Sequence, residues 1–242
     1  MGISMKVEFS AKTDIGLVRK KNEDFIFFDN DHLLALLADG VGGESHGELA
    51  SKLAVESSYE KIKEKRDELP PQELVFRAFE HAQKNIEDFR ANNASIKGVL
   101  TTLDCMYFSE KNLYFGHTGD GRIYRISRGK IKQLTSDHNV KTFISQGLIE
   151  EENYQHLRQD ALLKVVGTKV WEPDLDSCVV EKGDIFFCAS DGLFGMLSDT
   201  EMLNIIEQPI SLNEMTENLI FLAKKAGGTD NISLIIAKVC ET

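Results

Sequence analysis

The sequence predicts one α+β domain in which layers of strands are covered by helices. Three observations lead to this fold class. The chain has 242 residues, of which 42% are hydrophobic, which is enough for one domain with a sizeable core. Short strand-like runs joined by turns dominate the chain, and blocks of helical periodicity interrupt them. Strands that bury one face on each other, with helices on the outside, form a layered sandwich.

The expected strands are short runs rich in β-branched or aromatic residues that end at Asp, Gly, Asn or Ser. Three of them follow one another at 103–108, 113–117 and 123–126. Their connections are too short for a parallel crossover, so these strands must be antiparallel. Further strands are expected at 25–28, 33–38, 177–180, 185–189 and 232–239.

Helices are expected at 47–66 and 72–90, separated by Pro70-Pro71, which suits the start of the second one. A further helix is expected around 212–222. Apolar residues recur in these helices at three- and four-residue intervals, so the stripes should face the core. They are Val75, Phe79, Ala82, Ile86 and Phe89 in one helix and Leu212, Met215, Leu219 and Leu222 in the other.

The polar stretch 137–161 has weak periodicity and is expected to be an insertion that lies over the surface. No linker between domains is evident on either side of it. We therefore expect a single domain that spans residues 1–242 and carries this one insertion.

Charge and hydropathy exclude several classes of protein. Asp and Glu number 39 against 28 Lys and Arg, which gives a net charge of −11. No positive charge is gathered to neutralise phosphates, so a nucleic-acid partner is not expected. The longest apolar run, Leu33–Ala38, is far shorter than the roughly 20 residues of a membrane span. Because the first residues also lack the pattern of a signal peptide, we expect a soluble cytoplasmic protein without a membrane partner.

The cysteines are widely spaced and form no C-x-x-C pair, which argues against a zinc ribbon or a dithiol redox site. Most lie among apolar, strand-like residues. They are therefore expected to be buried thiols in a reducing compartment. The four are Cys105, Cys178, Cys188 and Cys240.

Four aspartates lie at the ends of the most apolar strands. Asp39, Asp120 and Asp191 follow expected strands, and Asp230 precedes one. A single Asp-Gly at a strand end is usually only a turn. Strand ends meet at the rim of a sheet, however, and four carboxylates there would repel one another unless a cation neutralised them.

Oxygen ligands alone indicate a hard divalent ion, Mg²⁺ or Mn²⁺. No close pair of histidines is present to suggest catalytic zinc. The glycines that follow Asp39 and Asp191 would let a backbone carbonyl approach the metal. Upstream, Arg19 could clamp a phosphate oxygen with its planar guanidinium. It could equally form an ordinary surface ion pair.

Other phosphoryl-transfer chemistries lack their sequence signatures. No Cys is followed by the arginine of a C-x5-R motif, and no P-loop is present. The D-x-D at Asp174–Asp176 lacks a preceding apolar strand, so an aspartyl-phosphate mechanism has little support.

The chain resembles the metal-dependent protein phosphatases of the protein phosphatase 2C type, in their bacterial form. Eight matching blocks occur in the family's order and cover nearly the whole chain. They are TDIGLVRKKNED (13–24), ADGVGG (38–43), GELAS (47–51), TTL (101–103), GHTGDGR (116–122), QLTSDH (133–138), CASDGL (188–193) and GGTDNIS (227–233).

This resemblance implies two packed antiparallel sheets flanked by helix pairs, a four-layer αββα sandwich. It also implies a role for each matching residue. Asp39 would bridge two metals, Gly40 would offer its carbonyl, and Asp191 and Asp230 would complete the first metal site. Asp120 with Asp191 would hold a third metal. Arg19 would bind the phosphate, and the residues that support the ligands and their waters would be Glu23, Asp24 and Asn231.

The sequence departs from the family pattern at several positions. Glu44 stands where bacterial members often have His, and Val41 stands where a general-acid His occurs in some members. Leu100 replaces a usual Gly, and Gly121 replaces the Ser of G-D-S-R. The stretch 139–161 corresponds to the variable flap beside the site, and its usual H-P-x-x-N motif is absent.

The expected function is that of a metal-dependent protein serine/threonine phosphatase. A hydroxide held between two Mn²⁺ or Mg²⁺ ions would attack the phosphoserine or phosphothreonine phosphorus directly. A metal-bound water would protonate the leaving group, with His46 and His138 as weaker candidates. The expected partners are phosphorylated proteins in signalling and a serine/threonine kinase. The alternatives are a pseudophosphatase or binding module on the same fold, or a phosphatase dedicated to one regulatory protein.

Overall fold

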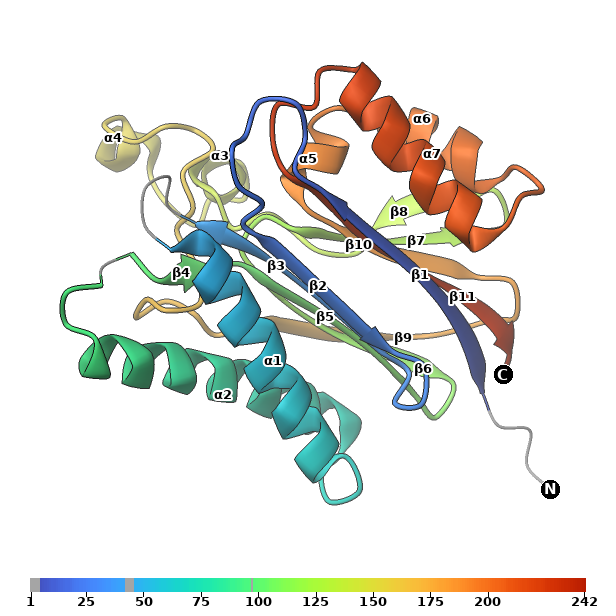
Figure 1. The fold of residues 1–242 in the computed structure, drawn as a ribbon, viewed down its shortest axis with the longest axis horizontal. Helices are drawn as coiled ribbons and strands as arrows, with labels where there is room; N and C mark the ends of the chain where they lie inside the picture. The colour runs from blue at the N-terminus through green and yellow to red at the C-terminus, as the bar shows by residue number, and fades with distance from the viewer. Residues whose placement is uncertain (1–4, 42–45, 97) are drawn as a thin grey trace.

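Two antiparallel sheets lie face to face, and helices cover both outer sides, as Figure 1 shows. This arrangement comes from a computed structural model, which describes residues 5–41, 46–96 and 98–242. It confirms the expected α+β class and the expected layering of helix, sheet, sheet and helix. Gly42 and Gly43 of the second matching block, and Glu44, where the sequence departs from the family pattern, lie outside the described residues.

The first sheet has five strands in the order β1-β11-β10-β7-β8. Every neighbouring pair in it is antiparallel. The strands are β1 (Lys6–Asp14), β7 (Arg122–Ser127), β8 (Lys130–Gln133), β10 (Ile185–Ala189) and β11 (Ile232–Glu241).

The second sheet runs in the order β2-β3-β5-β6-β9, and the short strand β4 pairs with the end of β3. These pairs are also antiparallel. The strands are β2 (Asp24–Asp29), β3 (Leu34–Val41), β4 (Leu100–Thr101), β5 (Leu103–Ser109), β6 (Asn112–Thr118) and β9 (Asp174–Val179).

Two long helices, α1 (Gly47–Lys65) and α2 (Pro71–Asn92), cover the outer face of the second sheet. On the first sheet lie α5 (Asp191–Phe194), α6 (Asp199–Ile206) and α7 (Leu212–Lys225). Ser198 and Ser211 cap α6 and α7 in reciprocal capping boxes, which satisfy backbone donors at the helix starts. The flap carries only the short helices α3 (Val140–Ser145) and α4 (Glu151–Tyr154). No helix in the described ranges is both long and apolar enough to cross a membrane.

The central strands bury both of their faces. In β3, Leu34 and Leu36 pack toward α1 and α2, while Ala35 and Leu37 pack between the sheets. In β10, Phe187 faces the helices and its neighbour Phe186 faces the other sheet. Successive side chains of a strand point to opposite faces, so a strand buried on both sides must be apolar throughout. This is why these strands appear as continuous apolar runs in the sequence.

The two edge strands of the five-stranded sheet differ from expectation. Neither β1 nor β8 was expected, since charged residues alternate with the apolar ones in both. Both are edge strands with one exposed face, where such alternation is normal. The small helix α6 was also missed, and β9 begins at Asp174 rather than Ser177.

The predicted surface insertion is wrong at its beginning. Residues Asp137 through Val140 are buried, with exposed fractions of 9% or less. His138 and Asn139 carry polar side chains that bond inside the fold, so the chain turns inward here. Only the part after Val140 is mostly exposed.

A buried ion pair lies between the strands next to the turn at Gly121. His117 Nδ1 is 2.7 Å from Asp104 Oδ1, and both side chains are almost fully buried. Burial opposes a charge on His117, but the Asp104 carboxylate outweighs it and raises the pKa of His117. The second oxygen, Asp104 Oδ2, has no hydrogen-bond partner in the described part of the chain and points at Gly121, where a Cβ atom would collide with it.

We expect Gly121→Ser to destabilise the fold by about 1–3 kcal/mol, because the new side chain must displace a buried carboxylate. The same substitution in an Asp104→Ala background should be clearly less costly, since the colliding oxygen is gone. Urea unfolding of the four proteins of this double-mutant cycle measures the coupling. Equal costs in both backgrounds would show that Asp104 does not determine the need for glycine at this turn.

Candidate metal centre

The four aspartates predicted from strand ends line one cavity of about 190 Å³. Asp39 lies near the end of β3, and Asp120 lies in the turn from β6 to β7. Asp191 begins α5 directly after β10, and Asp230 precedes β11. The two sheets thus contribute to one acidic site. The other lining residues are Arg19, Glu23, Gly40, Val41, Thr102, Leu162 and Asn231.

Mutual repulsion dominates the electrostatics of this cavity. Burial raises the pKa of Asp39 well above its ordinary value, and the charges of Asp24, Asp191 and Asp120 raise it further. Burial and the charge of Asp191 raise the pKa of Asp120 to about 7. Burial and Asp230 likewise raise the pKa of Asp191. The site therefore needs either protons or a bound cation.

The donor set fits a divalent cation that prefers oxygen. Among the described lining residues, every charged group apart from Arg19 is a carboxylate. The buried Oδ1 atom of Asp191 has no hydrogen-bond partner among the residues that the structure describes, and a cation could take that place. Within the described ranges, no three His, Cys, Asp or Glu side chains come close enough to enclose an ion. The carboxylates of the described residues surround the cavity instead of meeting at one point.

Two threonines that the sequence analysis did not single out hold the backbone of Asp39. Thr102 Oγ1 accepts a hydrogen bond from Asp39 N at 2.9 Å, and Thr102 N donates to Asp39 O at 2.9 Å. Thr101 Oγ1 also donates to Asp39 O at 2.8 Å. Both threonines are fully buried or nearly so. The T-T-L block contained this signal, but only the structure shows what it supports.

A close approach of two glycines holds the next residue of β3. A Cβ atom on Gly40 would collide with the backbone of Gly47 at the start of α1, and one on Gly47 would meet the Glu23 carboxylate. Gly40 N donates to Glu23 O at 3.1 Å. The first turn of α1 therefore presses directly against the strand that carries Asp39.

Arg19 reaches the cavity from the loop between β1 and β2. Its Nη2 atom is 2.5 Å from Asp230 Oδ2, and this bond raises the pKa of Arg19. Asn231 fixes the loop: its Nδ2 donates to Ile15 O at 3.0 Å and to Lys21 O at 2.9 Å. The Oδ1 atom of Asn231 accepts from Glu23 N at 2.9 Å. Asn231 thus joins the segment before β11, which carries Asp230, to the loop between β1 and β2, which carries Arg19.

The two acidic neighbours in the first matching block occupy different places. Glu23 lines the cavity, whereas Asp24 lies behind it and is not among the lining residues. Asp24 pairs with Asp39 across β2 and β3, and its Oδ2 accepts a 2.8 Å hydrogen bond from Ser190 Oγ. Burial raises the pKa of Asp24 even though Ser190 opposes the shift.

The two histidines considered as proton donors are not among the cavity-lining residues. His138 is buried, and both of its ring nitrogens are engaged. Gly119 N donates to Nδ1 at 3.0 Å, and Nε2 is 3.0 Å from Asp174 Oδ2. In addition, His138 N donates to Gly119 O at 2.7 Å. His138 therefore secures the turn that carries Asp120, at the inward start of the flap.

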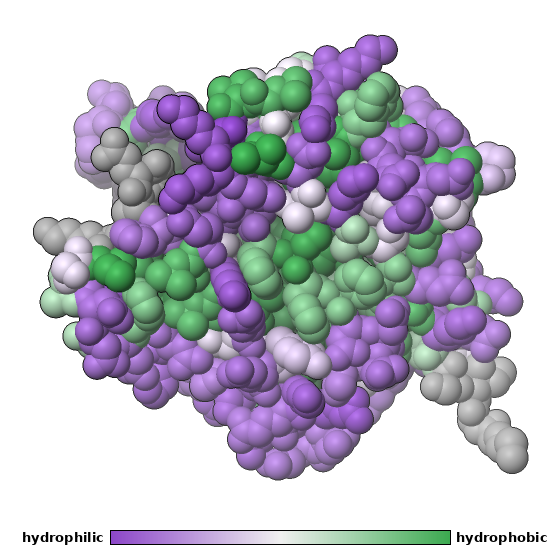
Figure 2. Space-filling view, in the orientation of Figure 1, coloured by the Kyte–Doolittle hydropathy of each residue, from purple (hydrophilic) through white to green (hydrophobic). Residues whose placement is uncertain are grey.

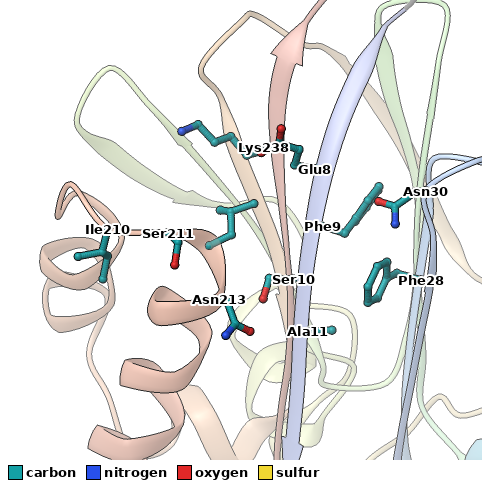
Figure 3. Close-up of a pocket in the computed structure, with 11 residues that line it drawn as sticks. Glu8, Phe9, Ser10, Ala11, Phe28, Asn30, Ile210, Ser211, Asn213 and Lys238 are labelled. Carbon is teal, nitrogen blue, oxygen red and sulfur yellow. The ribbon is translucent and has the colours of Figure 1, made fainter.

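A larger cavity of about 530 Å³ lies elsewhere, between the edges of β1 and β2 and the start of α7. Figure 3 shows Phe9 and Phe28 side by side at one end of it. Their ring centroids are 5.7 Å apart. None of the predicted site residues lines this cavity, so its size does not make it the candidate site.

Comparison with known proteins agrees with this geometry. The family profile of protein phosphatase 2C matches residues 19–225. The chain belongs to the protein phosphatase 2C family. A Streptococcus pyogenes relative, named by type as protein phosphatase 2C-type, is 35% identical over 95% of this chain and 96% of its own. Protein phosphatase PhpP of Streptococcus pneumoniae is 30% identical over 97% of this chain and 98% of its own.

Solved structures of protein phosphatase 2C relatives share the whole fold. The Mycobacterium tuberculosis serine/threonine phosphatase PstP aligns with a TM-score of 0.86 at 28% identity, over 98% of this chain and all of that one. The PstP catalytic domain in complex with two manganese ions aligns with a TM-score of 0.83 at 29% identity, with the same coverage. The described strands and helices thus form a protein phosphatase 2C fold.

Without metal, we expect the protein to lose stability as the pH rises from about 5 to about 8. The carboxylates of Asp39, Asp120 and Asp191 keep protons in the folded state at pH values where the unfolded chain has released them, so stability falls with pH. Mn²⁺ should reverse this, because metal affinity grows as the ligands lose protons. Thermal unfolding in EDTA and in Mn²⁺ across this range measures both effects.

Asp120→Asn is the matched control for this pH dependence. It keeps the size of the side chain but removes one titrating group, so stability in EDTA should fall less steeply with pH. If this variant and the unmodified protein have the same slope, Asp120 does not contribute to the effect.

Proposed function

We propose that this chain is a metal-dependent protein serine/threonine phosphatase that hydrolyses phosphoserine and phosphothreonine without a covalent enzyme intermediate. One observation carries the proposal: Asp39, Asp120, Asp191 and Asp230 surround a cavity that Arg19 also enters, in a chain of the protein phosphatase 2C family. The relatives named as serine/threonine phosphatases support the reaction, and the family supports the fold around it.

Two divalent cations, Mn²⁺ or Mg²⁺, would be held by Asp39 between them, by the carbonyl of Gly40, and by Asp191 and Asp230. Asp120 and Asp191 would hold a third. Support for two ions comes from the PstP structure with two manganese ions and from the unpaired Asp191 Oδ1 atom. When bound, such ions acidify water and stabilise charge on a phosphate ester.

Arg19 would bind a phosphate oxygen. Its guanidinium lines the cavity and is already turned toward the carboxylates. A planar guanidinium matches phosphate geometry and would stabilise charge that grows in the transition state. Glu23 and Asn231 at the cavity lining, and Asp24 behind it, would position the ligands and ordered water.

Proton transfer to the departing serine or threonine oxygen would come from water. No histidine is present among the described residues that line the cavity, and Val41 occupies the position of the general-acid histidine found in some relatives. His138 is bonded to Gly119 and Asp174 and would serve as a positioning residue for the Asp120 turn.

The partners would be phosphorylated proteins, including products of a serine/threonine kinase, and the setting would be cytoplasmic signalling. A pseudophosphatase or binding module on the same fold is the alternative, and the presence of Asp39, Asp191 and Asp230 speaks against it. Hydrolysis of a phosphothreonine peptide in Mn²⁺, with and without chelator, decides between them. Activity that requires the metal supports the enzyme; tight peptide binding without hydrolysis supports the binding module.

Asp39→Asn should fold but lose on the order of 10³-fold or more in kcat. Asn keeps the size of the side chain but loses the charge and one oxygen ligand, so both metal sites should weaken together. Calorimetric titration with Mn²⁺ measures the weakening independently of activity. Near-normal hydrolysis by a folded Asp39→Asn protein would contradict the two-metal proposal, and with it the roles of Asp191 and Asp230.

The thiols should be dispensable for hydrolysis, because no sulfur nucleophile is needed. Burial raises the pKa values of Cys105 and Cys188, so neither thiol forms a reactive thiolate at neutral pH. Replacing the buried Cys105 and Cys188 by Ala and the partly exposed Cys178 and Cys240 by Ser should keep kcat within a few-fold. A selective loss of kcat on changing Cys188 alone, with unfolding excluded by circular dichroism, would assign that thiol a role.

A further inference from the structure

Apolar side chains gather on the loop that brings Arg19 to the cavity. Leu17 and Val18 have exposed fractions of 63% and 64%, and Ile15 nearby is also exposed. Single exposed apolar residues are common on protein surfaces, but three within four positions form a patch. Figure 2 shows hydrophobic atoms at the upper edge of the molecule, where Figure 1 places the loop between β1 and β2.

This loop is held rigidly. Leu17 N donates to Gly228 O at 2.8 Å, and Gly16 N donates to Asp14 Oδ1 at 2.9 Å. Lys224 Nζ in turn donates to Asp14 Oδ2 at 2.8 Å. Gly16 adopts a left-handed backbone with a φ of +80°, and a Cβ atom there would collide with Asp230 O. Together with the two bonds from Asn231 described above, these contacts fix the loop before any substrate arrives.

A loop that is already fixed and exposes aliphatic side chains is preorganised for a partner. Binding to it costs little backbone entropy, because the loop does not have to be ordered first. The position of the loop argues for a phosphorylated partner. Val18 directly precedes Arg19, the proposed phosphate ligand, so the two exposed side chains lie one and two positions from the group that would hold the phosphate. Consecutive residues of an extended peptide are about 3.3–3.6 Å apart. The side chains one or two positions from a phosphorylated residue bound at Arg19 could therefore contact Val18 or Leu17.

Charge also favours a phosphorylated segment over other partners. Three successive cations follow Val18 in a protein whose net charge is −11: Arg19 pairs with Asp230, Lys21 pairs with Glu48 at 3.0 Å, and Lys20 is exposed. The exposed apolar side chains therefore lie next to an exposed cation and to the guanidinium that lines the acidic cavity. A peptide that carries one phosphate and an apolar neighbour complements both features.

We propose that Leu17 and Val18 form a recognition surface for a large apolar side chain one or two positions from the phosphorylated residue of a protein substrate. The proposal rests on the phosphatase function proposed above and specifies its substrate. Binding there would bury aliphatic surface on both sides and would raise kcat/KM for such substrates.

The test uses the full chain in Mn²⁺ with two phosphothreonine peptides. One peptide has Leu at the flanking positions on both sides, and the other has Ser at the same positions. The ratio of kcat/KM for the two peptides is the readout. We expect the unmodified enzyme to prefer the Leu peptide by about tenfold, which corresponds to about 1.4 kcal/mol.

In the double variant Leu17→Ser, Val18→Ser this preference should fall to within about twofold of unity. The matched control is Val179→Ser on β9, which removes a Val of similar exposure (66%) outside the acidic cavity and should keep the preference. Both changes are at exposed positions, and circular dichroism checks that each variant is folded.

The outcomes are distinct. An unmodified enzyme that hydrolyses both peptides equally, or a double variant that keeps the tenfold preference, overturns the recognition surface and leaves the phosphatase function intact. A uniform loss on both peptides with the ratio unchanged means that the loop only supports Arg19, and this also overturns the proposal. If neither peptide nor a small aryl phosphate is hydrolysed in Mn²⁺, the phosphatase function itself is wrong.

Discussion

Repulsion among buried carboxylates is the constraint on which the rest of this structure depends. Asp24, Asp39, Asp120 and Asp191 all have pKa values raised by burial and by the charges of neighbouring carboxylates. Such groups move apart or take up protons unless the backbone leaves them no alternative. Here the carboxylates are held by strands and turns of both sheets. These strands are held in turn by hydrophobic clusters that lie away from the cavity.

The anchoring is strongest at Asp39. Its backbone is bonded to Thr101 and Thr102, and its strand is pressed against α1 through the contact of Gly40 with Gly47. The strand itself is buried on both faces. Moving Asp39 away from its neighbours would break these contacts together, so the fold stabilises an arrangement of charge that would otherwise relax. A cation bound by the proposed ligands would gain affinity, because the fold already holds these carboxylates together.

The sequence alone predicts those elements and site residues whose physical signal lies within one segment of the chain. Strands buried on both faces, such as β3 and β10, are continuous apolar runs, and the aspartates at their ends stand out for that reason. Edge strands such as β1 and β8 have alternating charges and resemble loops. Supporting residues such as Thr102 and His138 depend on contacts between segments far apart in the chain, and a single sequence does not show which segments meet. The same limit explains why Asp137–Val140 was assigned to the surface.

The polar stretch that begins at Asp137 has two parts with different roles. Its buried start supports the turn that carries Asp120, and the rest is exposed. His138 binds Gly119 through two backbone-directed hydrogen bonds and is itself held by Asp174, while Arg122 clamps Asp137 with two 2.8 Å bonds. The turn that carries Asp120 is therefore supported by the first residues of the flap and by β9. Beyond Val140 the flap is mostly exposed, and among the described residues that line the acidic cavity none belongs to it; Leu162 lines the cavity just after its end. Because the support ends before the exposed part begins, the outer flap is free to vary in sequence without moving Asp120.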